Sequence, residues 1–213
     1  KDGMLQGSLN GSTTVQAGNT SKGEEWHFKV HPNDGSDFGI WIGSNNITIG
    51  NTAPSASNLI ITPADAKTAA DLTSSYDFAD VDSGDSDSGS FIRWYKNGIL
   101  QVALNDSLTV DSSLTAKGEN WYFTVIPFDG SDYGTIKTSS TILILNTAPS
   151  ASSLILSPGT PQTTDSLTAS YTWTDPDNAT DSESDSIIIW YKDGVLQSVL
   201  NNTLIVDSSF TSK

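Results

Sequence analysis

The chain has 213 residues, of which 25 are acidic and 10 are basic, and its formal net charge is −15 at pH 7. This charge repels nucleic acids and anionic lipid surfaces, so neither is expected as a partner. The sequence contains no cysteine and no apolar run long enough to cross a bilayer, which excludes disulfide bonds and a membrane span in this segment.

The sequence repeats itself. The motif NTAPSAS at 51–57 returns at 146–152, which gives a period of 146 − 51 = 95 residues. The same offset relates KGEEWHFKVHPNDGSDFG, which starts at Lys22, to KGENWYFTVIPFDGSDYG, which starts at Lys117. With one inserted residue, the segment that starts at Trp94 returns at Trp190. Such self-similarity predicts a row of modules and favours a structural or adhesive role over catalysis.

Residues 1–50 enter a repeat in its middle and are predicted to form its C-terminal part, strands C′ to G. The outward positions of a predicted strand at 26–31 hold His27, Lys29 and His31, and apolar residues alternate with them. The next copy keeps the apolar residues and changes the others; the conserved pairs are Trp26 and Trp121, Phe28 and Phe123, and Val30 and Val125. One face of this strand is therefore predicted to be core and the other to be free to vary.

Residues 51–145 are predicted to form one complete repeat of seven short strands, separated by turn residues such as the Asn-Gly pair at 97–98. The strands are expected at 59–62 (A), 72–80 (B), 91–96 (C), 100–104 (C′), 108–110 (E), 120–126 (F) and 135–145 (G). A repeat of roughly 100 residues with seven strands predicts an all-β fold of tandem immunoglobulin-like β-sandwiches, each a two-sheet Greek key. Trp94 and Trp121 are expected in its core.

Residues 146–213 are predicted to form the N-terminal part of a third repeat, strands A to E. Neither this part nor residues 1–50 holds a full set of strands. Two explanations stay open. The chain is an excerpt of a longer array, or the two incomplete parts complete one another between neighbouring molecules.

The strands RWYKNG at 93–98 and IWYKDG at 189–194, the segment KGENWYFTVIPFDG from Lys117 and the NTAP motifs carry a family likeness. The chain resembles the tandem immunoglobulin-like, cadherin-like or fibronectin type III-like repeats of large archaeal or bacterial cell-surface proteins. The resemblance implies an extracellular location and a role as stalk, adhesin or surface-filament subunit. Implied partners are neighbouring repeats, copies of the same chain, surface glycans or other cells. Without a cysteine pair, the likeness is architectural.

Acidic residues gather in the predicted B–C and F–G loops, which share one end of such a sandwich, close to the start of strand A. They are Asp80, Asp82, Asp85, Asp87, Asp129 and Asp132 in the second repeat, and Asp175, Asp177, Asp181 and Glu183 in the third. Because Ca²⁺ takes six to eight oxygen ligands at about 2.3–2.6 Å, these loops predict Ca²⁺ binding that stiffens the repeat junctions, as in cadherin-like arrays. The alternative is a solvated acidic loop that needs no ion.

The residue inventory predicts that the chain is not an enzyme. Its only histidines, His27 and His31, lie on the outward face, and their counterparts Tyr122 and Ile126 could not perform the same chemistry. The sequence has no nucleophile elbow, phosphate-binding loop or HExxH motif. The carboxylates lie in loops without an apolar pocket that would raise one pKa for acid–base work.

Carbohydrate enters the predictions in two ways. Three N-x-Ser/Thr sequons occupy the same turn in the three repeats and are candidate glycosylation sites, at Asn10, Asn105 and Asn201. The second way is the alternative function, a carbohydrate-binding accessory region of a secreted polysaccharide-degrading enzyme. In that case the aromatic residues near the F–G loop, Trp41, Tyr133 or Phe38, would stack on sugar rings.

Overall fold

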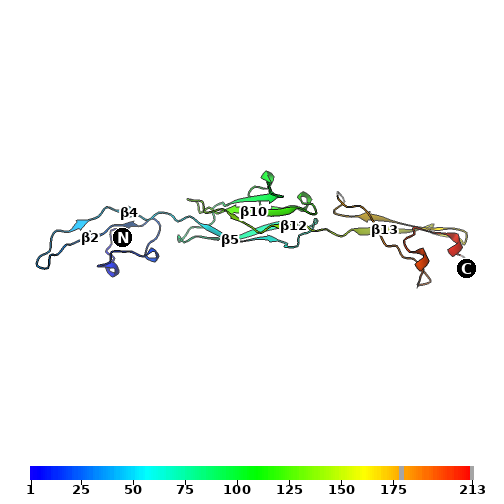
Figure 1. The fold of residues 1–213 in the computed structure, drawn as a ribbon, viewed down its shortest axis with the longest axis horizontal. Helices are drawn as coiled ribbons and strands as arrows, with labels where there is room; N and C mark the ends of the chain where they lie inside the picture. Colours follow the sequence, from blue (N-terminus) through cyan, green and yellow to red (C-terminus); the bar gives the residue numbers. More distant parts are fainter. Residues whose placement is uncertain (178–179, 212–213) are drawn as a thin grey trace. The chain divides into compact units, whose positions relative to one another are not determined.

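The computed structural model describes residues 1–177 and 180–211. Over these residues the chain forms short strands in several small antiparallel sheets, together with 3₁₀ turns, and has no α-helix (Figure 1). The predicted all-β class is therefore confirmed. No helix in the described part is long and apolar enough to span a membrane.

The chain divides into two compact units. The first comprises Lys1–Thr62, Thr73–Val110 and Asn120–Ile142, and the second comprises Pro63–Leu72, Asp111–Glu119 and the chain from Leu143 onward. The repeat boundaries after residues 50 and 145 remain a prediction from the sequence.

The first unit contains most residues of twelve strands. They are β1 (Glu25–Trp26), β2 (Lys29–Val30), β3 (Ile42–Gly43), β4 (Ile47–Thr48), β5 (Ser55–Thr62), β6 (Leu72–Ala79), β7 (Phe91–Lys96), β8 (Ile99–Leu100), β9 (Thr109–Val110), β10 (Asn120–Ile126), β11 (Lys137–Thr138) and β12 (Ile142–Leu143). Strands β1 and β4 pair, as do β2 and β3. A three-stranded sheet has the order β5-β6-β9, and a five-stranded sheet has the order β11-β10-β7-β8 with β12 also on β10.

The best-buried part of the first unit lies on β7 and β10. Their register places Trp94 opposite Phe123 and Ile92 opposite Val125. Trp94, Trp121, Phe123 and Val125 are fully buried, as the alternation in the sequence predicts. The Trp94 ring lies 5.3 Å from that of Phe123, and its indole N–H donates to the Ser107 carbonyl at 2.9 Å. Burial of these rings is the main stabilising contribution of this sheet.

Strand β5 bends through a β-bulge. Its register on β6 shifts between Ser57 and Ile60, where Asn58 has φ of +51°. The bulge lets Ala56 and Ile61 both be buried although they are five positions apart, a spacing that places residues of a regular strand on opposite faces. Strand β5 contacts β10 and β11, and Figure 1 shows β5 and β10 in separate layers.

Three predicted strands differ from the observed ones by more than a single residue at one end. Strand A begins at Ser55, four residues early, because the bulge lets pairing continue past Asn58. The predicted C′ strand stops after Leu100, since Val102–Leu104 forms the 3₁₀ turn η3. The predicted G strand is split into β11 and β12. Between them, Ser139 accepts from the Phe123 N–H with its hydroxyl oxygen, at 3.0 Å, in place of a backbone carbonyl.

The predicted strand at 26–31 is also discontinuous, since β1 and β2 are separate pairs of residues. Strand β10, its counterpart, is paired with β7 along six residues. In the described structure, no strand equivalent to β7 pairs with residues 26–31. The missing neighbour accounts for the break, because a strand paired on one side only has fewer backbone hydrogen bonds to keep it extended.

The second unit holds two further sheets, of order β13-β14-β17 and β15-β16. The strands are β13 (Ser150–Ser157), β14 (Leu167–Thr174), β15 (Tyr191–Lys192), β16 (Val195–Leu196) and β17 (Ile205–Val206). The remaining 3₁₀ turns of the chain are η1 (Gly7–Leu9), η2 (Ala17–Asn19), η4 (Ser112–Leu114), η5 (Ser198–Leu200) and η6 (Ser208–Phe210). Strand β13 repeats the bulge of β5, with Ser153 at φ of +53°. The Trp190 indole donates to the Thr203 carbonyl at 2.9 Å, as Trp94 does to Ser107.

Candidate cation sites in the acidic loops

Two acidic loops follow equivalent strands. Strand β6 ends at Ala79 and β14 ends at Thr174, and a carboxylate comes directly after each. In each loop, three carboxylates bring an oxygen atom within 4.8 Å of one another; the first trio is Asp80, Asp82 and Asp85, and the second trio is Asp175, Asp177 and Asp181. Ligand oxygens on opposite sides of one Ca²⁺ lie about 4.6–5.2 Å apart, so this spacing suits a single ion.

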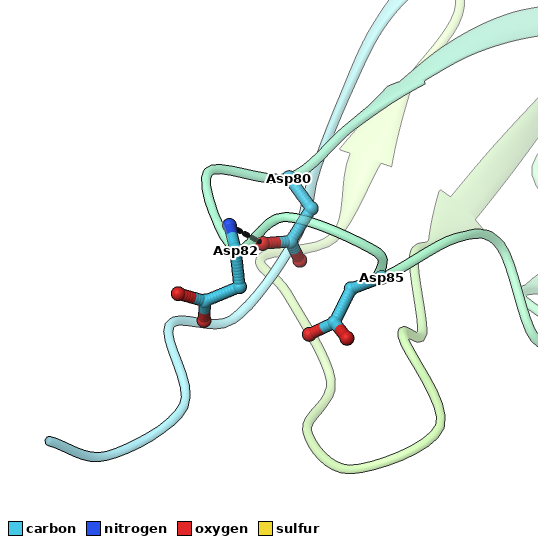
Figure 2. A group of neighbouring side chains, drawn as sticks. All are labelled: Asp80, Asp82 and Asp85. Atoms are coloured by element: carbon cyan, nitrogen blue, oxygen red, sulfur yellow. Dashed lines mark hydrogen bonds between the residues drawn. The ribbon is translucent and has the colours of Figure 1, made fainter. Parts of the chain in front are cut away.

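The first trio is arranged by backbone hydrogen bonds (Figure 2). Asp80 Oδ1 accepts from the Asp82 N–H at 2.7 Å, and Asp82 Oδ2 accepts from the Thr52 N–H at 2.6 Å. The second oxygen of Asp80, Oδ2, is buried and has no hydrogen-bond partner among the described residues. A buried carboxylate oxygen without a partner is costly, and a bound cation would compensate it.

Asn51, the residue before Thr52, holds the F–G loop by two hydrogen bonds. Its Nδ2 donates to Asp129 Oδ2 at 2.9 Å and to Asp132 Oδ2 at 2.8 Å. The hydrogen bond from Asn51 is the main reason that the pKa of Asp129 lies below its usual value, which keeps this carboxyl ionised. The remaining oxygen of Asn51, Oδ1, is buried and unpaired within the described part of the chain. An amide oxygen is a good ligand for a hard cation.

The second trio repeats the geometry in a more buried form. Asp175 Oδ1 accepts from the Asp177 N–H at 2.6 Å, and Asp177 Oδ2 accepts from the Thr147 N–H at 2.7 Å. Asp175 is 7% exposed and Asp177 is 4% exposed. The other oxygen of Asp177, Oδ1, has no hydrogen-bond partner in residues 1–177 and 180–211. Two adjacent buried carboxylates with one orphaned oxygen form the stronger of the two candidate sites.

One lysine lies at each trio. Lys22 Nζ is 2.9 Å from Asp85 Oδ2, and this hydrogen bond raises the pKa of Lys22. Lys117 Nζ contacts both oxygens of Asp181, at 2.6 and 2.5 Å, which likewise raises the pKa of Lys117, and it reaches Asn146 Oδ1 at 3.0 Å. One ammonium against three carboxylates leaves an excess of two negative charges at each trio. That excess favours binding of a divalent cation.

The structure places the other predicted ligands elsewhere. Asp87 accepts from the Tyr76 hydroxyl at 2.6 Å and from the Ser90 hydroxyl at 2.8 Å, and neither bond involves the trio. Glu183 makes the equivalent bonds with Tyr171 and Ser186. These two acids fasten their loops to the preceding strand. Asp129 and Asp132 are not members of the first trio; both accept from Asn51, and Asp129 also interacts electrostatically with Lys22, the lysine paired with Asp85.

Residues of the repeated motifs NTAP and KGE complete both sites. The backbone N–H groups of Thr52 and Thr147 and the side chains of Lys22 and Lys117 were not predicted from the sequence as parts of the acidic sites. Their repetition in the same spacing as the aspartates was the available signal. The sequence did not show that these residues lie close to the aspartates, because Thr147 and Asp177 are 30 residues apart and only the fold brings them together.

The candidate carbohydrate features also have defined places. Asn10, Asn105 and Asn201 each follow a 3₁₀ turn, η1, η3 or η5, and are exposed. His31 stacks between Phe38 and Trp41, with ring centroids 4.6 and 4.4 Å apart, and these two outer rings are exposed. Tyr133 stacks on Phe128 and Phe91.

No protein-family model, curated protein or solved structure matches the chain. The interpretation of the two acidic sites therefore rests on their own geometry.

Proposed function

We propose that this chain is a non-catalytic stretch of an extracellular structural or adhesive array, built from tandem immunoglobulin-like β-sandwiches whose junctions bind Ca²⁺. The array would serve as a stalk, adhesin or surface-filament subunit. Its function is mechanical, since it sets the spacing and stiffness between whatever lies at its two ends.

The strand order supports the sandwich. In the repeat at 51–145, β5-β6-β9 corresponds to an A-B-E sheet and β11-β10-β7-β8 to a G-F-C-C′ sheet, which is the division found in fibronectin type III-like modules. The buried tryptophan on β7, Trp94, occupies the C-strand position. The contact of β5 with β10 and β11 is consistent with two sheets face to face.

The observation that carries the Ca²⁺ proposal is that the same arrangement of three carboxylates occurs twice and leaves an unsatisfied oxygen each time, although on non-equivalent residues. Both trios contain a buried carboxylate oxygen without a hydrogen-bond partner in the described structure, on Asp80 and on Asp177. Each trio also receives a backbone N–H from the segment that begins a repeat, Thr52 or Thr147. A bound Ca²⁺ would supply two positive charges between this segment and the loop. It would thereby restrict motion of the segment that joins successive repeats.

Calcium titration of the full chain tests this function. Calorimetry with millimolar Ca²⁺ is expected to give a binding heat for two sites, and small-angle X-ray scattering is expected to show a narrower distribution of interatomic distances with Ca²⁺ than with chelator. Mg²⁺ is the control, because it demands a smaller octahedral site and keeps its waters. Absence of heat together with unchanged scattering would leave only solvated acidic loops.

The exposed stack of Phe38, His31 and Trp41 favours a second candidate function, binding of polysaccharide. The counterpart of Trp41 in the next repeat is Ile136, which is also exposed, so this side of the hairpin faces solvent in both copies. A stacked pair of aromatic rings contributes about 0.5–1.5 kcal/mol beyond the area it buries, and a contribution of this order is expected from a sugar ring stacked on Trp41. Trp41→Ala is therefore expected to weaken retention on insoluble polysaccharide about threefold to tenfold, with Ile136→Ala as the matched control. Equal retention of both variants would eliminate this candidate.

A further inference from the structure

Residues 25–48 expose an apolar face that the complete repeat buries. Phe123 and Val125 of β10 are 0% exposed, whereas their counterparts 95 residues earlier, Phe28 and Val30, are 67% and 48% exposed. The residues are identical and the alternation is the same. The difference is that no sheet lies over Phe28 and Val30 in the described part of the chain.

The sheet β13-β14-β17 also exposes an apolar face, which is the counterpart of the buried face of the sheet that contains β5. Ile61 of β5 is 5% exposed, and its counterpart on β13, Leu156, is 53% exposed. An open hollow of about 580 Å³ runs along this face, lined by Ala151, Leu156, Ala169, Trp173, Ile188 and Trp190. Residues 187–190 belong to no strand, although their counterparts 91–94 form most of β7. This face therefore lacks both an apolar cover and a strand neighbour.

The complete repeat identifies the segment that fits this hollow. There, β10 pairs with β7 in the register Phe123↔Trp94 and Thr124↔Arg93, and it contacts β5 of the other sheet. The segment of this chain with the same inward residues and spacing is 25–48. The exposed faces of residues 25–48 and of the sheet β13-β14-β17 are therefore complementary, and the complete repeat shows how two such faces pack together.

We propose that residues 25–48 of one copy of the chain dock on β13, β14 and residues 187–191 of a second copy, so that chains join head to tail. The register of the complete repeat places Phe28 opposite Trp190 and Lys29 opposite Ile189 of the other copy. Because every copy carries both faces, the interface is heterologous and generates rings or open filaments. The inference rests on the sandwich module of the proposed function and does not require Ca²⁺.

Docking exchanges two existing hydrogen bonds, the first of which runs from the Asp2 N–H to the Glu25 carbonyl at 2.8 Å. Asp2 Oδ1 accepts from the Glu25 N–H at 2.9 Å, and Asn97 Oδ1 accepts from the Asn120 N–H at 2.9 Å in the complete repeat. The third-repeat counterpart of both acceptors is Asp193, which has the same positive φ. Docking replaces Asp2 by Asp193 of the other copy. An aspartate replaces an aspartate, so the exchange itself is close to neutral in free energy.

The mass of the full chain in solution tests the association. Light scattering during size-exclusion chromatography is expected to give a mass that rises with concentration, in Ca²⁺ and in chelator alike. Phe28→Asp is expected to lower the association constant at least about tenfold, because docking would bury an unpaired charge. Ile40→Asp is the matched control, because Ile40 is exposed and its counterpart in the complete repeat, Thr135, is exposed as well. Since Phe28 is exposed in the single chain, its substitution leaves the monomer's fold intact.

Disulfide trapping tests the register, and the absence of native cysteine makes it specific. A mixture of Lys29→Cys and Ile189→Cys chains is expected to form a mixed disulfide under mild oxidation, whereas Ser140→Cys with Ile189→Cys is not. A strictly monomeric chain at high concentration, or equal trapping in both mixtures, overturns the proposal. An intrachain disulfide in a chain that carries both Lys29→Cys and Ile189→Cys overturns it as well. A monomeric chain that still binds Ca²⁺ would overturn this inference and leave the proposed function in place.

Discussion

Replacing Trp94 with alanine is expected to lower the free energy of unfolding of the complete repeat by about 3–5 kcal/mol. The ring is fully buried and packs edge-on against Trp121 at 6.3 Å between centroids. Its removal leaves a cavity bounded by that ring and by Phe123, and it also removes the donor to the Ser107 carbonyl. Urea unfolding followed by far-ultraviolet circular dichroism measures the change.

Two matched tryptophans serve as controls for this substitution. Trp41→Ala removes an exposed ring and is expected to leave the free energy of unfolding within about 0.5 kcal/mol of that of the original chain. Trp190→Ala alters the equivalent position of the third repeat, where the ring is only half-buried, and is expected to cost less than Trp94→Ala. Equal losses at Trp94 and Trp190 would contradict the difference in packing between the two repeats.

Asp177→Asn is expected to remove most of the stability that Ca²⁺ adds to the second unit. When free Ca²⁺ is about 100 times its Kd, a single site raises the free energy of unfolding by about 2.7 kcal/mol. Asparagine keeps the size of the side chain and an oxygen that can accept from the Thr147 N–H, but it removes the charge from the orphaned oxygen. Thermal unfolding with Ca²⁺ and with chelator measures the effect.

The sign of the effect is expected to reverse in chelator. Without a cation, Asp177 lies among Asp175 and Asp181 with Lys117 as the nearby counter-charge. Removing one of three adjacent negative charges then relieves repulsion, so the variant unfolds at a higher temperature than the original chain. Asp37→Asn, at an exposed position outside both trios, is the control. An identical Ca²⁺-induced shift in Asp37→Asn and Asp177→Asn would rule out the second trio as the binding site.

The internal repeat made β7 and β10 predictable from sequence. Comparing Trp26, Phe28 and Val30 with their later copies separates positions that are kept from positions that vary, and period two then gives the buried face. The observed bounds of both strands match the predicted ones. Alternation was decisive because these two strands pair with one another along six residues.

Local departures from regular pairing escaped prediction. The bulge at Asn58 depends on which backbone groups of the neighbouring strand are available for pairing. So does the hydroxyl of Ser139, which replaces a backbone acceptor, and the sequence of one strand does not contain this information. Which aspartates belong to each acidic trio could not be predicted for the same reason. Asp82 is placed by a backbone N–H thirty residues away, whereas Asp87, five residues further along, is taken by a tyrosine on β6.

The repeated bulge has a consequence for how copies of the chain can meet. Strands β5 and β13 are outer strands of their sheets, and an outer strand that is flat and regular is a template for unwanted pairing with other chains. The left-handed residues Asn58 and Ser153 kink these strands and break the row of free backbone groups. The opposite outer strands, β9 and β17, are only two residues long. Addition of a strand from another chain is therefore disfavoured at both edges of these sheets, and lateral aggregation is suppressed along an array of such repeats.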